Sequence, residues 1–336
     1  MKLLTVVIPC YNSQDYMEAC VDSILPGGDR VEIIIINDGS KDRTGEIADR
    51  YAAQYPDIVK VVHQENGGHG EGINQGLRRA TGRYFKTVDS DDVLSDDFPK
   101  FLDTLEALDR QGGVDLVLTN YYYVHADGVG DKSINYANAL PADRVFTWDE
   151  TRRFQVHQIL MIHACTFRTE LLKQTGVELP KHTFYEDNYF VYGNLRDALR
   201  LYYLNMDLYR YTIGREGQSV QEDVMTRRYA HQLKATELCF TAFHLGDIPQ
   251  KRKRAYLRHE LFIMLGISVI YARLNKTREA EARLAEMWKL FKDYDRAWAN
   301  RFHFRTPLVF ISIPGKVGAA VSNGVYRLAH KVVRFN

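Results

Sequence analysis

Three aspartates in the stretch TVDSDDVL (residues 87–94) are the first candidates for chemistry. Asp89, Asp91 and Asp92 occupy three of four consecutive positions directly after a short apolar run. Like charges this close repel one another, and capping of the next helix does not explain them, because residues 95–97 already supply serine and aspartate for that purpose. An EF-hand is excluded, since Lys100 stands where such a loop needs its glutamate. These carboxylates could instead hold Mg²⁺ or Mn²⁺ and leave coordination positions for substrate phosphates.

A fourth aspartate, Asp38, follows the apolar run VEIIIIN within the stretch NDGSKDRT. Asp-Gly and Gly-Ser are turn formers, so the stretch fits a simple turn in which Asp42 caps the following helix. A carboxylate at the end of a buried strand could equally accept hydrogen bonds from a base or a ribose. The sequence alone leaves both interpretations open.

The segment NGGHGEGINQG (residues 66–76) holds five glycines. It fits neither the G-x-G-x-x-G pattern of dinucleotide sites nor a P-loop, which would need G-K-[ST]. A glycine-rich turn that enters a helix could still face phosphates. Within it, His69 is either a ligand contact or an ordinary loop residue.

An acidic pair, Glu186 and Asp187, lies inside the aromatic stretch FYEDNYF. Adjacent acids are common in the first turn of a helix, where the helix dipole favours them. Flanking aromatic rings would also lower the local dielectric and raise a carboxylate pKa toward the range useful to a general base. Both interpretations fit the pair.

The first 120 residues alternate between short β-branched runs and stretches with helical spacing, which predicts an α/β sandwich with right-handed crossovers. In such sheets ligands bind at the carboxyl ends of the strands, where NDGS and DSDD lie. The predicted strands are residues 5–8, 31–36, 59–62, 84–88 and 116–119. The predicted helices are residues 14–25, 42–54, 71–80 and 96–108.

The pattern becomes mixed after residue 120. We expect an exposed or edge strand with a turn at 121–128, a helix at 148–162 and a pair of strands at 200–211. Nearly all of the chain after residue 221 has helical spacing. The sequence therefore predicts two domains, residues 1–220 and residues 221–336.

Composition sets outer limits on function. Hydrophobic residues make up 45% of the chain and charged residues 26%, which is typical of a soluble globular protein. A net charge of +1 gives no sign of nucleic-acid binding, and four scattered cysteines predict neither disulfides nor a zinc site. The longest apolar run, residues 261–272, is shorter than the roughly 20 residues of a membrane span. We expect a cytoplasmic protein.

The end of the chain is basic, with no aspartate or glutamate after Asp295. Residues 316–334 place valines and a leucine on one helical face and Lys316, Arg327, Lys331 and Arg334 on the other. This pattern fits a helix that rests on an anionic membrane surface, on the inner face of the membrane. Ordinary packing with a solvated basic face is the alternative.

Taken in order, the motifs VVIPCYN, IINDGSKDRT, NGGHGEGINQG, ATGRYFKTVDSDD and YEDN resemble those of glycosyltransferase family 2. The resemblance covers roughly residues 3–215. It implies an inverting nucleotide-sugar transferase with the GT-A fold, a Rossmann-like nucleotide-binding α/β sandwich, here followed by a helical C-terminal extension.

The resemblance also implies roles for single residues. Tyr11 would lie against the donor base, Asp38 would contact the uridine, and Asp187 would deprotonate the acceptor hydroxyl. Asp89 and Asp91 form the DxD motif that binds the metal ion, with no third ligand evident beyond the candidates His163 and His182. The residues expected to contact the donor are Pro9, Tyr11, Asp38, His69, Asn74, Asp89 and Arg215, with Gln218 and Ser219 as weaker candidates.

Two departures from the family pattern affect the expectation. Many members carry arginine just before the asparagine matched by Asn74, but here the residue is Ile73. The phosphate charge must then be met in another way, for which His69, Arg215 and the metal ion are candidates. The QxxRW signature of processive synthases is absent, so we expect one sugar to be transferred per encounter.

We therefore expect an enzyme that uses Mg²⁺ or Mn²⁺ to transfer a sugar from a UDP-sugar to a hydroxyl of a surface glycan or lipid-linked acceptor. Two alternatives remain at this point. One is a sugar nucleotidyltransferase on the same fold, which would usually show a glycine- and basic-rich N-terminal signature. The other is a non-catalytic protein that binds nucleotides or sugars.

Overall fold

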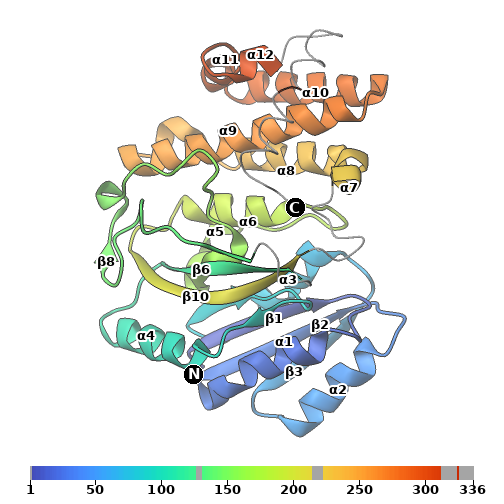
Figure 1. Cartoon of the computed structure of the whole chain (residues 1–336), viewed down its shortest axis with the longest axis vertical. Helices are drawn as coiled ribbons and strands as arrows, with labels where there is room; N and C mark the ends of the chain where they lie inside the picture. Colours follow the sequence, from blue (N-terminus) through green and yellow to red (C-terminus); the bar gives the residue numbers. More distant parts are fainter. Residues whose placement is uncertain (1, 126–130, 214–221, 312–323, 325–336) are drawn as a thin grey trace. The chain divides into compact units, whose positions relative to one another are not determined.

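The computed structural model describes residues 2–125, 131–213, 222–311 and 324. The chain divides into two compact units (Figure 1). The first unit comprises Met1–Arg153 and Leu160–Ile213, and the second comprises Phe154–Ile159 and Gly214–Asn336. The chain thus leaves the first unit for six residues and then returns to it.

Four parallel strands form the first half of the sheet in the first unit, in the order β3-β2-β1-β4. All eight residues of β2 are buried, as expected for a strand covered on both faces. The strands are β1 (Leu4–Cys10), β2 (Val31–Asp38), β3 (Val59–Gln64) and β4 (Tyr84–Thr87). The helices that connect them are α1 (Met17–Ile24), α2 (Thr44–Gln54) and α3 (His69–Arg79), with α4 (Phe98–Arg110) after β4 and the 3₁₀ turn η1 (Leu25–Arg30) before β2. These elements confirm the predicted alternation of strands and helices.

The sheet continues from β4 through β9, β6 and β10 to β5. Because β9 is antiparallel to both of its neighbours while β10 is parallel to β6, this half is mixed. The bounds are β5 (Val93–Leu94), β6 (Leu116–His125), β9 (Cys165–Arg168) and β10 (Leu201–Ile213), with β7 (Lys132–Ile134) on β6 and β8 (Val145–Phe146) on β10. The helices α5 (Thr169–Thr175) and α6 (Glu186–Leu195) follow β9. The exposed or edge strand predicted at 121–128 is wrong for its described part, because residues 121–125 of β6 are buried or half-buried and pair with β10, and residues 121–123 also pair with β7 on the other side.

The predicted pair of strands at 200–211 is also wrong, because these residues form the single strand β10. Its pairing with β6 shifts between Leu204 and Asp207 and again between Asp207 and Tyr209. The polar residues at this irregularity resemble a turn in the sequence. Here Asn205 and Asp207 accept hydrogen bonds from the Nδ2 of Asn120, at 2.9 and 3.1 Å. The hydrogen bonds from β6 therefore allow these polar residues to lie within a continuous strand, at an irregularity in its pairing, where the sequence predicted a turn.

The predicted helix at 148–162 is wrong as well. Only the 3₁₀ turn η2 (Trp148–Glu150) and the start of η3 (Ile162–Ala164) are helical there. The apolar residues that suggested an amphipathic helix serve other contacts. Trp148 is buried and donates its Nε1 hydrogen to the Ala198 carbonyl at 2.8 Å, and the Phe154 ring packs 4.6 Å from that of Tyr256 in the second unit.

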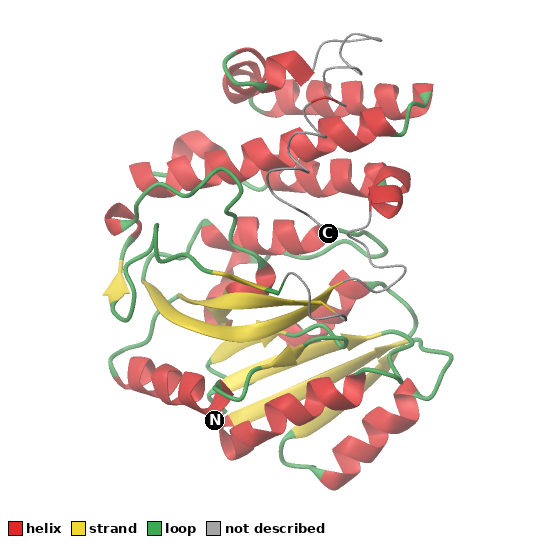
Figure 2. Cartoon of the chain, in the orientation of Figure 1, coloured by secondary structure: helices red, strands yellow, loops and turns green. Residues whose placement is uncertain are grey.

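The second unit contains helices and loops, with no strand in its described part (Figure 2). The helices are α7 (Glu222–Arg227), α8 (Tyr229–Thr241), α9 (Lys251–Leu274), α10 (Arg278–Tyr294), α11 (Arg296–Phe304) and α12 (Leu308–Ile311), with the 3₁₀ turn η4 (Leu245–Asp247) after α8. The predicted helical character of this region is confirmed for the described residues. One helix, α9, has the length and apolar content of a membrane span, and half of that stretch is buried within the structure. The predicted amphipathic helix at 316–334 lies outside the described residues, apart from Gly324.

Candidate active site

The carboxyl ends of the adjacent parallel strands β2, β1 and β4 bring together three of the predicted motifs. Pro9 lies near the end of β1, opposite Ile36 of β2, and Tyr11 follows that strand with 53% of its surface exposed. Asp38 is the last residue of β2, and Asp89 follows β4 after one intervening residue. The topology therefore collects these residues at one edge of the sheet, where α/β proteins bind their ligands.

Asp38 holds the glycine-rich segment in place. Its carboxylate accepts hydrogen bonds from the backbone N–H groups of Gly67 and Gly68, at 2.7 and 2.9 Å, and from the Nε2 of Gln64 at 2.7 Å. Asn74 has a similar anchoring contact: its side-chain amide exchanges two hydrogen bonds with the backbone of Leu179, at 2.8 and 3.0 Å. Both residues are buried and support the loops around the site.

The three aspartates after β4 have different surroundings. Asp92 is fully buried and accepts hydrogen bonds from the Tyr209 hydroxyl at 2.7 Å and from the Thr212 N–H at 2.9 Å. Burial, followed by the charges of Asp89 and Asp91, raises the pKa of Asp92 well above its ordinary value. Asp91 is half-buried. Asp92 thus fastens this loop to β10.

His69, the first residue of α3, lies between two carboxylates. Its Nε2 is 3.0 Å from Oδ1 of Asp89, and its Nδ1 is 3.0 Å from Oε1 of Glu186. Burial opposes a charge on His69, but the two hydrogen bonds outweigh it and raise the pKa of His69 well above its ordinary value. Burial likewise opposes the charge of Asp89, yet the hydrogen bond and charge of His69 lower the pKa of Asp89 to about 2.

Glu186 and Asp187 form the first turn of α6, preceded by Tyr185 with a backbone φ of 65°. Glu186 is buried, and Asp187 accepts a hydrogen bond from the Nδ2 of Asn188 at 3.0 Å. Burial, followed by the negative charge of Glu186, raises the pKa of Asp187 to about 6. A carboxylate with such a pKa is suited to accept a proton near neutral pH.

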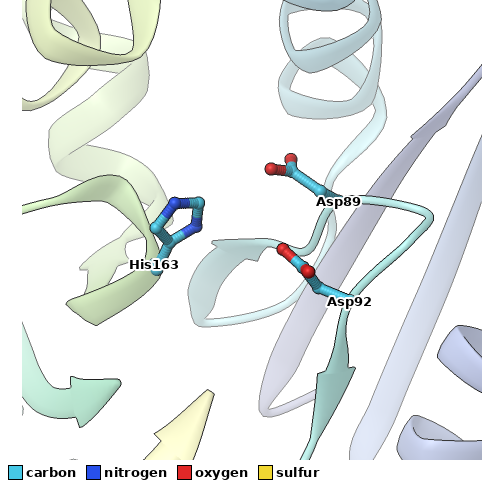
Figure 3. Close-up of side chains that lie close together, drawn as sticks. All are labelled: Asp89, Asp92 and His163. Atoms are coloured by element: carbon cyan, nitrogen blue, oxygen red, sulfur yellow. The ribbon is translucent and has the colours of Figure 1, made fainter. Parts of the chain in front are cut away.

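Asp89 and Asp92 also face a histidine that could share a cation with them (Figure 3). One ligand atom from each of Asp89, Asp92 and His163 lies within 4.8 Å of the others. Burial lowers the pKa of His163 to about 4, so the imidazole is neutral and offers a lone pair. The described residues provide no hydrogen-bond partner for its ring nitrogens. Carboxylate oxygens and neutral imidazole are ligands of divalent metals, so this group fits such an ion.

A buried lysine donates a hydrogen bond to the backbone of His163. Lys86, in the middle of β4, donates to the backbone carbonyls of His163 at 2.6 Å and Cys165 at 3.4 Å. Its ammonium also lies 5.4 Å from the centre of the Tyr209 ring. Burial lowers the pKa of Lys86 to about 8. The lysine thus joins β4 to the turn that carries His163.

The sequence model described as "Glycosyl transferase family 2" matches residues 5–173, half of the chain. The uncharacterized glycosyltransferase EpsJ of Bacillus subtilis is 30% identical over 278 residues, which cover 79% of this chain and 78% of EpsJ. The chain belongs to glycosyltransferase family 2. This enzyme is also 30% identical over 217 residues to the uncharacterized glycosyltransferase YibD of Escherichia coli, across 62% of this chain and 60% of YibD.

Solved structures confirm the GT-A fold of this glycosyltransferase. TarS 1-349 of S. aureus, crystallised in complex with UDP-GlcNAc, superimposes with a TM-score of 0.68 at 21% identity, over 99% of this chain and 92% of that one. The mannosyltransferase PcManGT of Pyrobaculum calidifontis, in complex with GDP-Man and Mn²⁺, gives a TM-score of 0.52 at 18% identity, over 95% and 86% of the two chains.

Only some of the predicted site residues lie close together in this glycosyltransferase. Asp89 and His69 are in contact, and Asp187 lies beside Glu186, which His69 also contacts. His182 is exposed and donates its backbone N–H to Gly67 at 2.9 Å. Arg215, Gln218 and Ser219 lie outside the described residues.

Sequence reasoning missed the roles of Lys86, Asp92 and Glu186. A signal existed for Lys86, since a charged residue interrupts the apolar strand YFKTV. Asp92 and Glu186 were recognised only as members of acidic groups. Their partners, Tyr209 and His69, lie 117 residues away in the sequence in each case, so the pairing required the fold.

Proposed function

We propose that this glycosyltransferase uses a UDP-sugar donor, depends on Mg²⁺ or Mn²⁺, and transfers the sugar with inversion to a hydroxyl group. The observation that carries the proposal is the placement of Asp187, with a pKa raised to about 6, in one cluster with Asp89 at the carboxyl ends of the strands. The complexes of TarS with UDP-GlcNAc and of PcManGT with GDP-Man and Mn²⁺ support the donor class and the cation, because both proteins share this fold.

Asp187 would act as the general base. Its ionised carboxylate takes the proton of the acceptor hydroxyl while the hydroxyl oxygen forms a bond to the anomeric carbon of the sugar. The bond between that carbon and the diphosphate oxygen breaks, and its electron pair leaves with the nucleoside diphosphate. Attack from the face opposite the leaving group inverts the anomeric centre, and no covalent intermediate with the protein is needed. Such a base typically contributes about 10²–10⁴-fold to the rate.

The cation would be held by Asp89 with Asp91, as the family resemblance implies, or with Asp92 and His163, as the geometry suggests. When bound, it would stabilise the negative charge that develops on the departing diphosphate. Tyr11 would stack against the base, and Pro9 and Asp38 would shape the edge of the sheet on which the nucleoside rests. The remaining phosphate contacts would come from Arg215, because both ring nitrogens of His69 already lie 3.0 Å from carboxylate oxygens.

The acceptor is proposed to be a growing surface glycan or its lipid carrier, reached from the cytoplasmic face of the membrane. The basic residues between 316 and 334 support this part, because they would draw the enzyme to an anionic surface. The donor and the acceptor are the expected partners, and nucleic acid is not among them.

Isothermal titration of UDP and several UDP-sugars, with and without Mn²⁺, tests the donor site. We expect binding that requires Mn²⁺ in the wild type and is retained by Asp57→Ala, a control at an exposed aspartate before β3. Loss of this binding in Asp91→Ala would assign the cation to the DxD motif, whereas loss in His163→Ala with retention in Asp91→Ala would assign it to the group with Asp92. Absence of binding for every uridine nucleotide would contradict the proposed donor.

A further inference from the structure

We propose that His69 is a positioning residue, which holds Glu186, and through it the adjacent Asp187, in a fixed place relative to Asp89. The inference rests on the proposed function of Asp89 and Asp187. Both ring nitrogens of His69 are engaged, each 3.0 Å from a carboxylate oxygen. One imidazole therefore connects the loop that follows β4 with the first turn of α6.

The backbone around His69 is built for this close approach. A Cβ atom on Gly68, whose φ is +85°, would lie 2.9 Å from the backbone nitrogen of His182. A Cβ atom on Gly70 would lie 2.9 Å from Cβ of Leu179 and 3.0 Å from Cγ of Glu186. Glycine on each side of His69 thus lets the start of α3 press against the segment that leads into α6. These close contacts explain why glycine flanks His69 on both sides.

The charges of the bridge also fit a positioning role. A carboxylate only accepts hydrogen bonds, so an imidazole between two carboxylates holds both of them by donating from both of its nitrogens. Glu186 is 2% exposed, and among the described residues His69 is the one hydrogen-bond partner of its carboxylate. Without His69, Glu186 would be a buried charge with no counter-ion, which is strongly unfavourable. The first turn of α6 would shift to relieve it and would carry Asp187 along.

A direct contact between His69 and the donor phosphates is the alternative role. The two roles predict different kinetics. Loss of a phosphate ligand weakens donor binding, whereas loss of a positioning residue lowers turnover and leaves donor binding nearly unchanged.

The test compares His69→Ala with His63→Ala. His63 is a matched control, because its Nε2 also lies 3.0 Å from an aspartate oxygen, that of Asp49, but on the exposed surface. The readouts are calorimetric binding of UDP with Mn²⁺ and the release of UDP from the tightest-binding UDP-sugar, with water as acceptor. For His69→Ala we expect kcat to fall about 10–10³-fold and the Kd for UDP to change less than about threefold. His63→Ala should match the wild type in both.

A second variant separates positioning from direct binding. In Glu186→Gln the buried charge is absent, so adding His69→Ala should lower kcat by much less than it does in the wild type. Additive effects of the two substitutions, or a loss of UDP affinity above tenfold with unchanged kcat in His69→Ala, would overturn the proposal.

The bridge can also be observed without turnover. The ¹⁵N resonances of the His69 ring should show both nitrogens protonated in the wild type, and Glu186→Gln should shift Nδ1 more than Nε2. This measurement applies even if His69→Ala does not fold. One protonated and one unprotonated ring nitrogen in the wild type would overturn the bridge. A wild type that binds no uridine nucleotide but shows the doubly protonated ring would contradict the proposed function and leave the bridge intact.

Discussion

At the scale of single residues, the surroundings of Asp187 make a prediction about pH. Burial and the charge of Glu186 raise its pKa to about 6. A general base works only in its ionised form, so turnover should rise with pH up to about 6 and level off above it, with about a tenfold loss for each pH unit below the pKa. The measurement is kcat for UDP release between pH 4.5 and 8.5.

Asp187→Asn is the companion variant for this profile. It keeps the shape of the side chain but cannot accept the proton, so kcat should fall about 10²–10⁴-fold while UDP binding is retained. A wild-type profile that is flat through pH 6, or an asparagine variant that keeps full activity, would contradict the role of Asp187 as the base.

The residue scale also shows the limit of prediction from sequence. Asp89 and Asp187 were recognised because acidic clusters in family motifs are visible in the sequence. The use of His69 as a bridge was not, because both of its partners are distant and its charge depends on their positions. Likewise, nothing in the sequence shows that Asp91 is half-buried whereas Asp92 is fully buried and accepts a hydrogen bond from Tyr209.

At the scale of elements, the close packing of α3 makes a prediction about Gly70. In an open helix, replacing glycine by alanine usually stabilises the fold by roughly 0.5–1 kcal/mol. At Gly70 the new methyl group would lie 2.9 Å from Cβ of Leu179 and 3.0 Å from Cγ of Glu186. We therefore expect Gly70→Ala to lower the free energy of unfolding by about 1–3 kcal/mol and to reduce turnover.

Urea denaturation of Gly70→Ala and Gly246→Ala provides the measurement and its control. A Cβ atom on Gly246 would have no neighbour within 4 Å, so that variant should stay within about 0.5 kcal/mol of the wild type. A Gly70→Ala protein as stable and active as the wild type would show that α3 can move away from α6 at little cost.

The elements also differ in how far the sequence predicts them. Strands such as β2 are recognisable because a strand covered on both faces must be apolar throughout. The strand β10 was predicted as two strands, because the polar residues Asn205 and Asp207 resemble a turn in the sequence. In the structure both accept hydrogen bonds from Asn120, which lies 85 residues before Asn205. The helix predicted at 148–162 failed for a related reason, since its apolar residues serve tertiary contacts such as that of Phe154 with Tyr256. Local periodicity cannot reveal partners of that kind.

At the scale of the whole molecule, the sequence and the structure bear on association with a membrane in different ways. The basic pattern at 316–334 predicts peripheral binding, and these residues lie outside the described part of the chain except Gly324. Helix α9 has the length and apolar content of a span, but half of that stretch is buried within the helical unit. Peripheral binding is electrostatic and is weakened by salt, whereas a spanning helix resists salt and yields only to detergent.

We therefore predict that the full chain co-sediments with vesicles rich in phosphatidylglycerol at low salt and is released at high salt. Each basic residue near an anionic surface contributes about 1 kcal/mol, so replacing Arg327, Lys331 and Arg334 by glutamate should weaken binding by about 100-fold or more. The matched control reverses three exposed charges of the first unit, Arg79, Lys100 and Arg110. Equal binding by both triple variants would contradict the role of the basic segment. Sedimentation that persists at high salt would instead assign the attachment to α9, because only a hydrophobic segment remains bound when the charges are screened.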